Sequence, residues 1–309
     1  MTSAVHSIEA ARAALGISYA EEKRIARELS PAIAWPTLAL AIFLPSTFAA
    51  FVALGLTHAL PQWVCTVMLM PVSYAHYTLV HEAIHGNVVS KPRRLAWINT
   101  LVGFVGSLGL GEAWPALQRT HYLHHSHTNT ELDPDIEVKG PLAQLLGMLA
   151  RALPFSFLPL NVLRHTGPKR YKELAVILNP AEIAHCSGMA LFQLAVPLAA
   201  LATGHFTDWL MLWFLPTRVA ILALKIMFSW LPHYPFDRTE RYHNTRISLW
   251  SGASLLTLQQ NLHLMHHLWP SVPFYNYARL FGALRPVLLA EGSAIQGLAV
   301  GPWVRTIAA

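Results

Sequence analysis

Residues 63–85 read WVCTVMLMPVSYAHYTLVHEAIH, an apolar stretch that ends with two histidines, His81 and His85. An α-helix of these 23 residues rises about 35 Å, and the hydrocarbon core of a bilayer is about 30 Å thick. The segment therefore predicts a membrane-spanning helix that carries both histidines to one surface of the membrane.

Four stretches of the chain are long and apolar enough to span a bilayer, namely 32–58, 63–80, 184–203 and 209–231. Short connections, one around Pro61 and one at 204–208, join them in pairs, so each pair predicts a helical hairpin. Two further apolar segments, 98–111 and 142–160, are shorter or interrupted. We expect these two segments to be re-entrant or interfacial rather than spanning.

The composition agrees with a membrane protein. Hydrophobic residues make up 54% of the chain and charged residues 12%, about half of the ~25% usual in soluble domains. These values exclude a disordered chain and a coiled coil. A disulfide scaffold is also excluded, because the chain has only two cysteines, Cys65 and Cys186, and both lie in apolar stretches. The net charge of +6 suits either nucleic acid or a membrane surface, and the apolar content favours the membrane. We therefore expect no nucleic-acid partner.

The lysines and arginines predict the orientation. Four lie in residues 1–31, ten in 81–182 and six in 232–309, whereas the two short hairpin turns have none. By the positive-inside rule, both termini and the middle segment are cytoplasmic, as expected for a multi-pass protein of the inner (cytoplasmic) membrane. Arg218 and Lys225 fall inside the fourth apolar stretch, and we expect them to snorkel or to face the protein interior.

Histidine is unusually frequent, with 17 residues, and eight of these form three clusters: HEAIH (81–85), HYLHH (121–125) and HLMHH (263–267). Residues three and four apart share one face of a helix, so each cluster projects its imidazoles in one direction. Imidazole binds iron, zinc and copper, and one metal takes three or four protein ligands. Eight histidines therefore predict two metal ions. Isolated histidines such as His58, His76 and His205 are expected to be ordinary packing residues.

The clusters are expected to meet at the membrane–cytosol boundary, where His233 of WLPH (230–233) also emerges from the fourth span. His233 is either a ninth ligand or a simple interfacial histidine. The predicted ligands are His81, His85, His121, His124, His125, His233, His263, His266 and His267. The predicted fold is an all-α integral membrane domain over 32–309, with four transmembrane helices in two hairpins and a cytoplasmic helical cap that carries the clusters. Residues 1–31 form a cytoplasmic N-terminal segment.

Residues near the clusters are candidates for holding the ligands in place. Metal-bound imidazoles usually donate their other N–H to a carboxylate or carbonyl oxygen. Asp133 and Asp135 follow the second cluster with His127 between, and Glu82 lies within the first. Asp-Pro-Asp is equally consistent with a simple turn.

The first cluster also satisfies H-E-x-x-H, in which two histidines bind zinc and the glutamate acts as general base. An intramembrane zinc protease is therefore an alternative. That chemistry needs one zinc and one further ligand, so it leaves the other two clusters without a role.

The three clusters between paired apolar spans resemble the histidine boxes of the membrane fatty acid desaturase superfamily. This resemblance covers the chain from about residue 32 onward. It implies four membrane helices, two non-haem iron ions, and O2-dependent desaturation or hydroxylation of a lipid hydrocarbon drawn from the bilayer. It also implies a histidine ligand outside the boxes, for which His233 has the matching position.

Within the superfamily, residues 124–135, 231–247 and 260–277 look most like bacterial and cyanobacterial carotenoid ring hydroxylases. Hydroxylation of a carotenoid ring such as that of β-carotene is therefore the first expectation, and acyl-lipid desaturation is the alternative. Carotenoid ketolases share the WLPH and DPD features and are a minor alternative. Because no cytochrome b5-like signature is present, the resemblance implies an external electron donor such as ferredoxin with an NAD(P)H-linked reductase.

The substrate is expected to enter along an apolar tunnel. Candidate lining residues, which are equally consistent with ordinary packing, are Trp97, Trp114, Phe228, Trp230, Trp250 and Leu255.

Overall fold

The computed structural model covers the chain and describes residues 17–135, 140–234 and 238–297. Residues 1–16 of the predicted N-terminal segment lie outside the described residues. From residue 19 to 127 the elements are α2 (Tyr19–Glu28), α3 (Trp35–Leu56), α4 (Gln62–Ile84), η1 (Arg93–Leu95), α5 (Trp97–Leu110) and α6 (Trp114–His127). From residue 142 to 202 they are α7 (Leu142–Ala152), η3 (Leu153–Phe157), α8 (Leu160–Thr166), α9 (Lys169–Ile177) and α10 (Pro180–Ala202).

The next elements join end to end into one helix of 28 residues, Phe206–His233. They are α11 (Phe206–Trp209), η4 (Leu210–Phe214), α12 (Leu215–Leu224), η5 (Lys225–Trp230) and α13 (Leu231–His233). The C-terminal elements are β1 (Ile247–Ser248), α14 (Ala253–Leu256), η6 (Gln260–Leu262), α15 (His263–Leu268), η7 (Phe274–Asn276), α16 (Tyr277–Ala290) and β2 (Ile295–Gln296). The two short strands are parallel.

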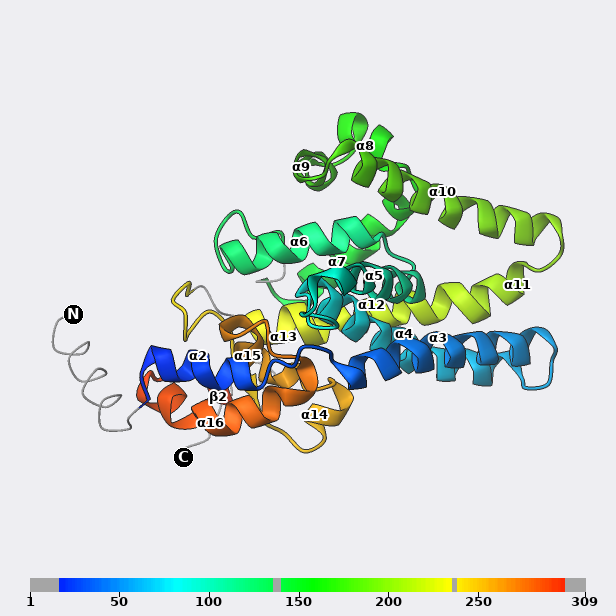
Figure 1. Ribbon diagram of the computed structural model, residues 1–309. Coiled ribbons are helices and arrows are strands. Elements are labelled where there is room, and N and C mark those ends of the chain that lie inside the picture. The colour runs from blue at the N-terminus through cyan, green and yellow to red at the C-terminus, as the bar shows by residue number, and fades with distance from the viewer. Residues whose placement is uncertain (1–16, 136–139, 235–237, 298–309) are drawn as a thin grey trace.

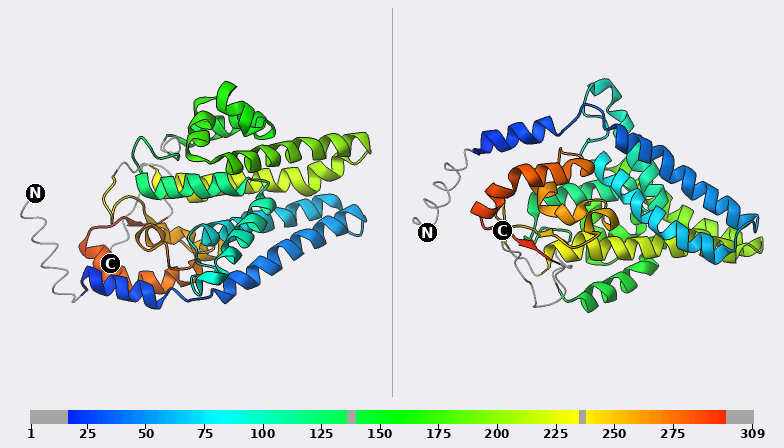
Figure 2. Two further views of the ribbon diagram at one scale, coloured as in Figure 1. Left: turned by 45° about the horizontal axis from the view of Figure 1, so that its top comes forward. Right: turned by 90° about the horizontal axis from the view of Figure 1, so that it is seen from below.

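Four helices of the described chain are long and apolar enough to cross a membrane, in agreement with the four predicted spans: Trp35–Leu56, Gln62–Ile84, Pro180–Ala202 and Phe206–His233. The bent pair Arg93–Leu110 and Trp114–His127 makes five when it is counted as one span. Short turns connect α3 to α4 and α10 to α11, and all four helices extend to the same end of the molecule (Figure 1). The remaining helices and both strands gather toward the opposite end, where both ends of the described chain lie (Figure 2). α4 is central, because it packs against α3, α5 and α12.

The segment predicted as re-entrant or interfacial, 98–111, forms α5, which meets α6 at an angle of 103°. Gly111 closes α5 with a φ of +66°, a left-handed conformation that glycine adopts without a steric penalty. The Arg218 guanidinium donates to the carbonyl of Leu110 at 2.9 Å and pairs with Glu112 at 3.3 Å. Arg218 therefore faces the protein interior, where it satisfies the free end of α5.

Glycines hold α5 against α4. A Cβ on Gly106 would lie 2.9 Å from the carbonyl oxygen of His76, and one on Gly109 would lie 2.2 Å from the His76 ring. Such close approach of two helix backbones is typical of small residues spaced along one helix face. The glycines therefore set the position of α5, and through it of α6, relative to the end of α4.

Substitution of Gly106 by alanine is expected to destabilise the protein by about 1–3 kcal/mol, because the new methyl group meets backbone that cannot rotate away. The measurement is the thermal midpoint of the purified protein in detergent. Gly188→Ala on α10 is the matched control, since a Cβ there has nothing within 4 Å. Equal midpoints for the two variants would contradict this account of the packing.

The other weak apolar segment, 142–160, forms α7 and η3, which together are too short to span a membrane.

Near the N-terminus, α2 packs against α16 in the same hydrophobic core as α15. Glu22 of α2 is fully buried and accepts a hydrogen bond from the Tyr242 hydroxyl at 2.9 Å. Residues 19–29 therefore belong to the packing that surrounds the third histidine cluster.

Candidate metal centre

Four helix ends bring the nine predicted histidines together. His81 lies in the last turn of α4 and His85 directly follows it, while His233 ends α13. The second cluster lies on α6 and the third on α15, so helical spacing aims the members of each cluster to one side. The π-helical turn η5 directly precedes α13, and such turns often occur at functional sites.

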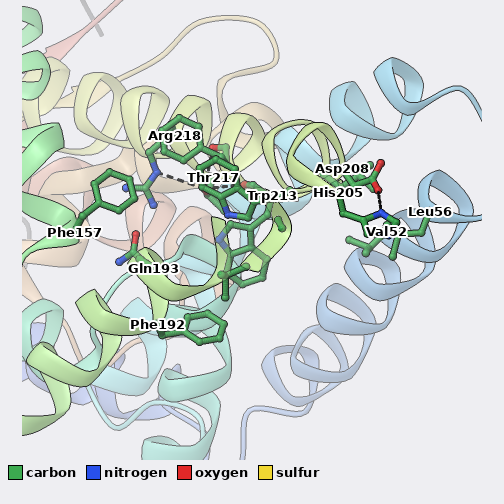
Figure 3. A pocket seen from close by; sticks show the side chains of 15 residues that line it. Val52, Leu56, Phe157, Phe192, Gln193, His205, Asp208, Trp213, Thr217 and Arg218 are labelled. Atoms are coloured by element: carbon green, nitrogen blue, oxygen red, sulfur yellow. Dashed lines mark hydrogen bonds and ion pairs between the residues drawn. The ribbon is translucent and has the colours of Figure 1, made fainter. Parts of the chain in front are cut away.

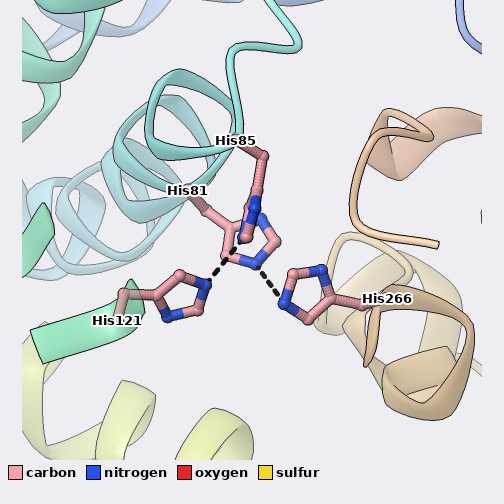
Figure 4. Close-up of side chains that lie close together, drawn as sticks. All are labelled: His81, His85, His121 and His266. Atoms are coloured by element: carbon pink, nitrogen blue, oxygen red, sulfur yellow. Dashed lines mark hydrogen bonds between the residues drawn. The ribbon is translucent and has the colours of Figure 1, made fainter. Parts of the chain in front are cut away.

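The first group consists of His81, His85, His121 and His266, whose ring nitrogens all lie within 4.8 Å of one another (Figure 4). Nε2 of His81 is 3.1 Å from Nε2 of His266, and Nε2 of His85 is 2.8 Å from Nε2 of His121. The group joins α4, α6 and α15.

The second group consists of His124, His233, His263 and His267. Nε2 of His263 is 3.1 Å from Nε2 of His233 and 3.1 Å from Nε2 of His267. His125 contacts both groups: its Nε2 lies 2.7 Å from that of His266 and 3.1 Å from that of His121 in the first group, and its ring stacks on that of His267 in the second, with 4.6 Å between the ring centroids. The structure therefore brings all nine predicted ligands together, in two groups of four with His125 in contact with both.

The spacing of the nitrogens fits metal coordination. Two imidazole nitrogens bound to one ion at about 2.1 Å and at right angles lie about 3.0 Å apart. The Nε2–Nε2 distances here are 2.7–3.1 Å. Burial, reinforced by the neighbouring imidazoles, lowers the pKa well below its ordinary value for His85, His121, His125, His263, His266 and His267. The rings are therefore held neutral, which is the form that binds a metal.

Asp133 and Asp135 have different partners. His124 donates from Nδ1 to Oδ1 of Asp133 at 2.9 Å, and the Asp133 carboxylate also accepts the backbone N–H groups of Asn129 and Asp135. Asp133 thus closes the turn and contacts a predicted ligand. Asp135 instead pairs with Lys225 at 3.0 Å. Burial is the largest single influence and would raise the pKa of Asp135, but the Lys225 ammonium, together with smaller contributions from His124 and His233, holds this pKa well below its usual range.

Glu82 is fully buried, and its Oε1 lies 3.8 Å from Nδ1 of His81 and accepts the backbone N–H of Phe274 at 3.2 Å. The carboxylate therefore lies on the Nδ1 side of His81, away from the Nε2 atoms that converge. This is not the placement that a zinc protease needs for its general base. Within the described chain, no hydrogen bond or ring contact joins His127 to the nine histidines.

Sequence reasoning missed Tyr277. Its hydroxyl lies 3.1 Å from Nδ1 of His266, and the side chain is fully buried. The tyrosine sits eleven residues after His266, beyond the reach of helical spacing. No periodicity marks it, because the contact arises only when α16 folds back onto α15.

Two of the cavities in the described structure differ in size and in place. The larger, of about 250 Å3, lies between α3, α10 and the Phe206–His233 helix and contains none of the nine histidines (Figure 3). The smaller lies beside His263. Of the six predicted tunnel residues, only Trp250 lines either cavity, the smaller one. Trp97 and Leu255 are 60% and 78% exposed, and Trp230 donates to the carbonyl of Gly140.

Known proteins resemble the chain over most of its length. Residues 57–298, which include all nine histidines, match the sequence profile of the family described as fatty acid desaturase. A beta-carotene ketolase of Paracoccus sp. (strain PC1) is 27% identical over 227 residues, which cover 72% of this chain and 80% of that protein. A beta-carotene ketolase of Paracoccus sp. (strain N81106 / MBIC 01143) is 30% identical over 204 residues, which cover 64% of this chain and 70% of that protein. A zeaxanthin 4-ketolase of Chlamydomonas reinhardtii is 24% identical over 230 residues, which cover 70% of this chain and 43% of that protein.

Proposed function

Because this chain belongs to the fatty acid desaturase family of membrane oxidoreductases, we propose that it oxidises a ring carbon of a carotenoid, with ketone formation as its main outcome. The observation that carries the proposal is the similarity to two beta-carotene ketolases over 227 and 204 residues, in a chain whose family match at 57–298 contains all nine histidines. The sequence motifs favour hydroxylation, with ketone formation as a minor alternative, whereas the named relatives favour ketone formation. Acyl-lipid desaturation is the remaining alternative within the family.

The donor set fits two iron ions. His81, His85, His121 and His266 would hold one, and His124, His233, His263 and His267 the other, with His125 within reach of either. When bound, the iron pair supplies reduction of O2 and cleavage of an unactivated C–H bond. The electrons would come from an external donor such as ferredoxin, itself reduced by an NAD(P)H-linked reductase.

The rest of the site keeps the ligands neutral and fixed. Burial disfavours imidazolium, so the proposed ligands stay available to metal at neutral pH. The Asp133 carboxylate fixes the His124 ring, and the Tyr277 hydroxyl does the same for His266. Leu264 and Met265 of the surrounding core are fully buried, whereas His85, His121, His125 and His267 are only partly buried.

We further propose that the histidines and both termini face the cytoplasm of a bacterial inner membrane, as the lysine and arginine distribution favours. A cysteine introduced at exposed Lys169 is expected to react with an impermeant maleimide only in inside-out vesicles. A cysteine at Thr203, in the turn after α10, is expected to react only in right-side-out vesicles. The reverse pattern would contradict this orientation.

The experiment that tests the function is expression in bacteria that accumulate β-carotene, followed by extraction of pigments and acyl chains. Ring ketones are expected as the main new pigment, with about two irons per purified chain. Ring alcohols as the end product would return the assignment to hydroxylation. Unchanged pigment with new acyl double bonds would contradict the carotenoid proposal in favour of desaturation.

A further inference from the structure

The segment 88–96, which joins α4 to α5, is tied to the starts of two helices. Asn99, buried in the first turn of α5, accepts the backbone N–H groups of Val88 and Val89 at 3.1 and 3.2 Å and donates to the carbonyl of Val89 at 2.8 Å. On its other side, the carbonyl of Val88 accepts the N–H of Ala34, directly before α3, at 2.9 Å. The starts of α3 and α5 therefore lie beside one another and beside this segment.

Both helices begin with an exposed tryptophan. Trp35 is the first residue of α3 and is 69% exposed, and Trp97 is the first residue of α5 and is 60% exposed. Leu101 and Phe104, which share a helix face with Trp97, are exposed as well. Exposed indoles at the end of an apolar helix are typical of the boundary between lipid hydrocarbon and headgroups. Segment 88–96 therefore lies at that boundary.

This segment carries positive charge that no acidic residue neutralises. Its exposed basic residues are Lys91, Arg93 and Arg94. Residues 83–111 contain no aspartate or glutamate, and within the described chain no ion pair joins the three to a carboxylate. Arg24 and Lys169, by contrast, each pair with a glutamate of the same helix. The charge at 91–94 is therefore available to an external anion.

We propose that Lys91, Arg93 and Arg94 bind the headgroup of an anionic phospholipid, with Trp35 and Trp97 seated between the headgroup and the hydrocarbon. A guanidinium binds phosphate through two parallel N–H groups, and an ammonium acts as a point charge. Basic residues directly outside a span are attracted to anionic lipid. This site is independent of which lipid hydrocarbon the enzyme oxidises.

The surroundings favour a phospholipid over an acidic protein as the occupant. A water-soluble protein can reach the charges at 91–94 but does not cover Leu101 and Phe104, which continue along α5 into the apolar part of the molecule. A phospholipid covers both, because its phosphate meets the basic residues while its acyl chains lie against the apolar face of α5.

A lipid bound here also contacts the frame of the metal centre. Segment 88–96 follows the first histidine cluster, and Asn87 between them donates from its side chain to the carbonyl of Pro270, just after the third cluster, at 2.9 Å. A ligand that binds only the folded chain raises its thermal midpoint. Phosphatidylglycerol added to the protein in detergent is therefore expected to raise this midpoint more than phosphatidylcholine with the same acyl chains.

Native mass spectrometry of the full-length protein tests the headgroup preference directly. The probes are phosphatidylglycerol and phosphatidylcholine with the same acyl chains, added in equal amounts. We expect the wild type to retain about tenfold more phosphatidylglycerol, with the preference falling as salt is raised. Arg93→Gln/Arg94→Gln is expected to bring retention of the two lipids close to parity. Arg279→Gln/Arg285→Gln is the matched control, because it removes two exposed charges from α16, at the end away from the hairpin turns, and it is expected to keep the preference (Figure 1).

Equal retention of the two lipids by the wild type would overturn the inference, and so would an equal loss of preference in the two double variants, which would show an effect of net charge alone. If Arg93→Gln/Arg94→Gln keeps the lipid preference but binds an acidic ferredoxin more weakly, the segment docks a protein and the lipid site is wrong. Trp97→Ala keeps all three charges and is expected to lower retention of both lipids alike. Unchanged retention of both would contradict the place given to the tryptophan.

Discussion

Substitution of His266 by alanine is expected to lower oxidation of the substrate more than about 100-fold and to remove iron from the purified protein. His266 is fully buried and belongs both to the first group and to the contacts around His125. Its Nε2 lies 3.1 Å from that of His81 and 2.7 Å from that of His125. Loss of this ring therefore removes one proposed ligand of the first ion and a contact of His125. The measurements are iron per chain and product per chain in the same preparation.

His76→Ala is the matched control, because His76 is also a buried histidine of the membrane domain. Its Nδ1 lies 2.8 Å from the carbonyl oxygen of Val72, one turn earlier in α4, and it contacts the ring of Phe48. We expect this variant to lose stability through the cavity it creates while keeping its iron. Substantial activity and full iron in His266→Ala, or equal iron loss in the two variants, would contradict the assignment of His266 as a ligand.

The positions of the spans and the convergence of the histidines could be predicted because each depends on local pattern. A span is a matter of length and hydropathy, as in 63–85, and the direction of each cluster follows from spacing along one helix. The prediction of His233 as a ligand also needed the position where the fourth span ends. All of these features can be predicted without knowing how the helices pack.

The remaining features of the site depend on contacts between distant segments. Asp133 and Asp135 occupy equivalent positions in one Asp-Pro-Asp motif, yet only Asp133 contacts a predicted ligand, because Lys225 of the fourth span captures Asp135. Tyr277 reaches the site only because α16 packs back against α15. The tunnel residues stay a prediction, since aromatic residues at a membrane surface need no ligand.

Asp133→Asn is expected to weaken metal binding or activity about 10- to 100-fold, with the effect centred on the second histidine group. The Asp133 carboxylate, 3% exposed, accepts from Nδ1 of His124 and from the backbone N–H of Asn129, each at 2.9 Å. An asparagine of the same size turns an NH2 group toward one of these donors, so one donor is left unpaired and the charge that favours the bound tautomer is lost. We expect the ring of His124 to remain present but to be poorly oriented.

Iron titration distinguishes this effect from loss of a ligand, because a misoriented ring still binds metal when the metal is abundant. At limiting iron the variant is expected to hold about one ion fewer than the wild type, and excess iron is expected to restore part of its activity. His266→Ala is expected to show no such recovery.

Asp208→Asn provides the matched control, since Asp208 pairs with Nδ1 of His205 at 2.7 Å in the same carboxylate–imidazole geometry, in the turn that opens the fourth span. That histidine belongs to neither group, so this variant is expected to keep both iron and activity. Equal losses in Asp133→Asn and Asp208→Asn would mean that the carboxylate stabilises the chain generally. Unchanged iron affinity in Asp133→Asn would mean that the protein fixes His124 by packing alone, in which case the short hydrogen-bonded turn serves only the local fold.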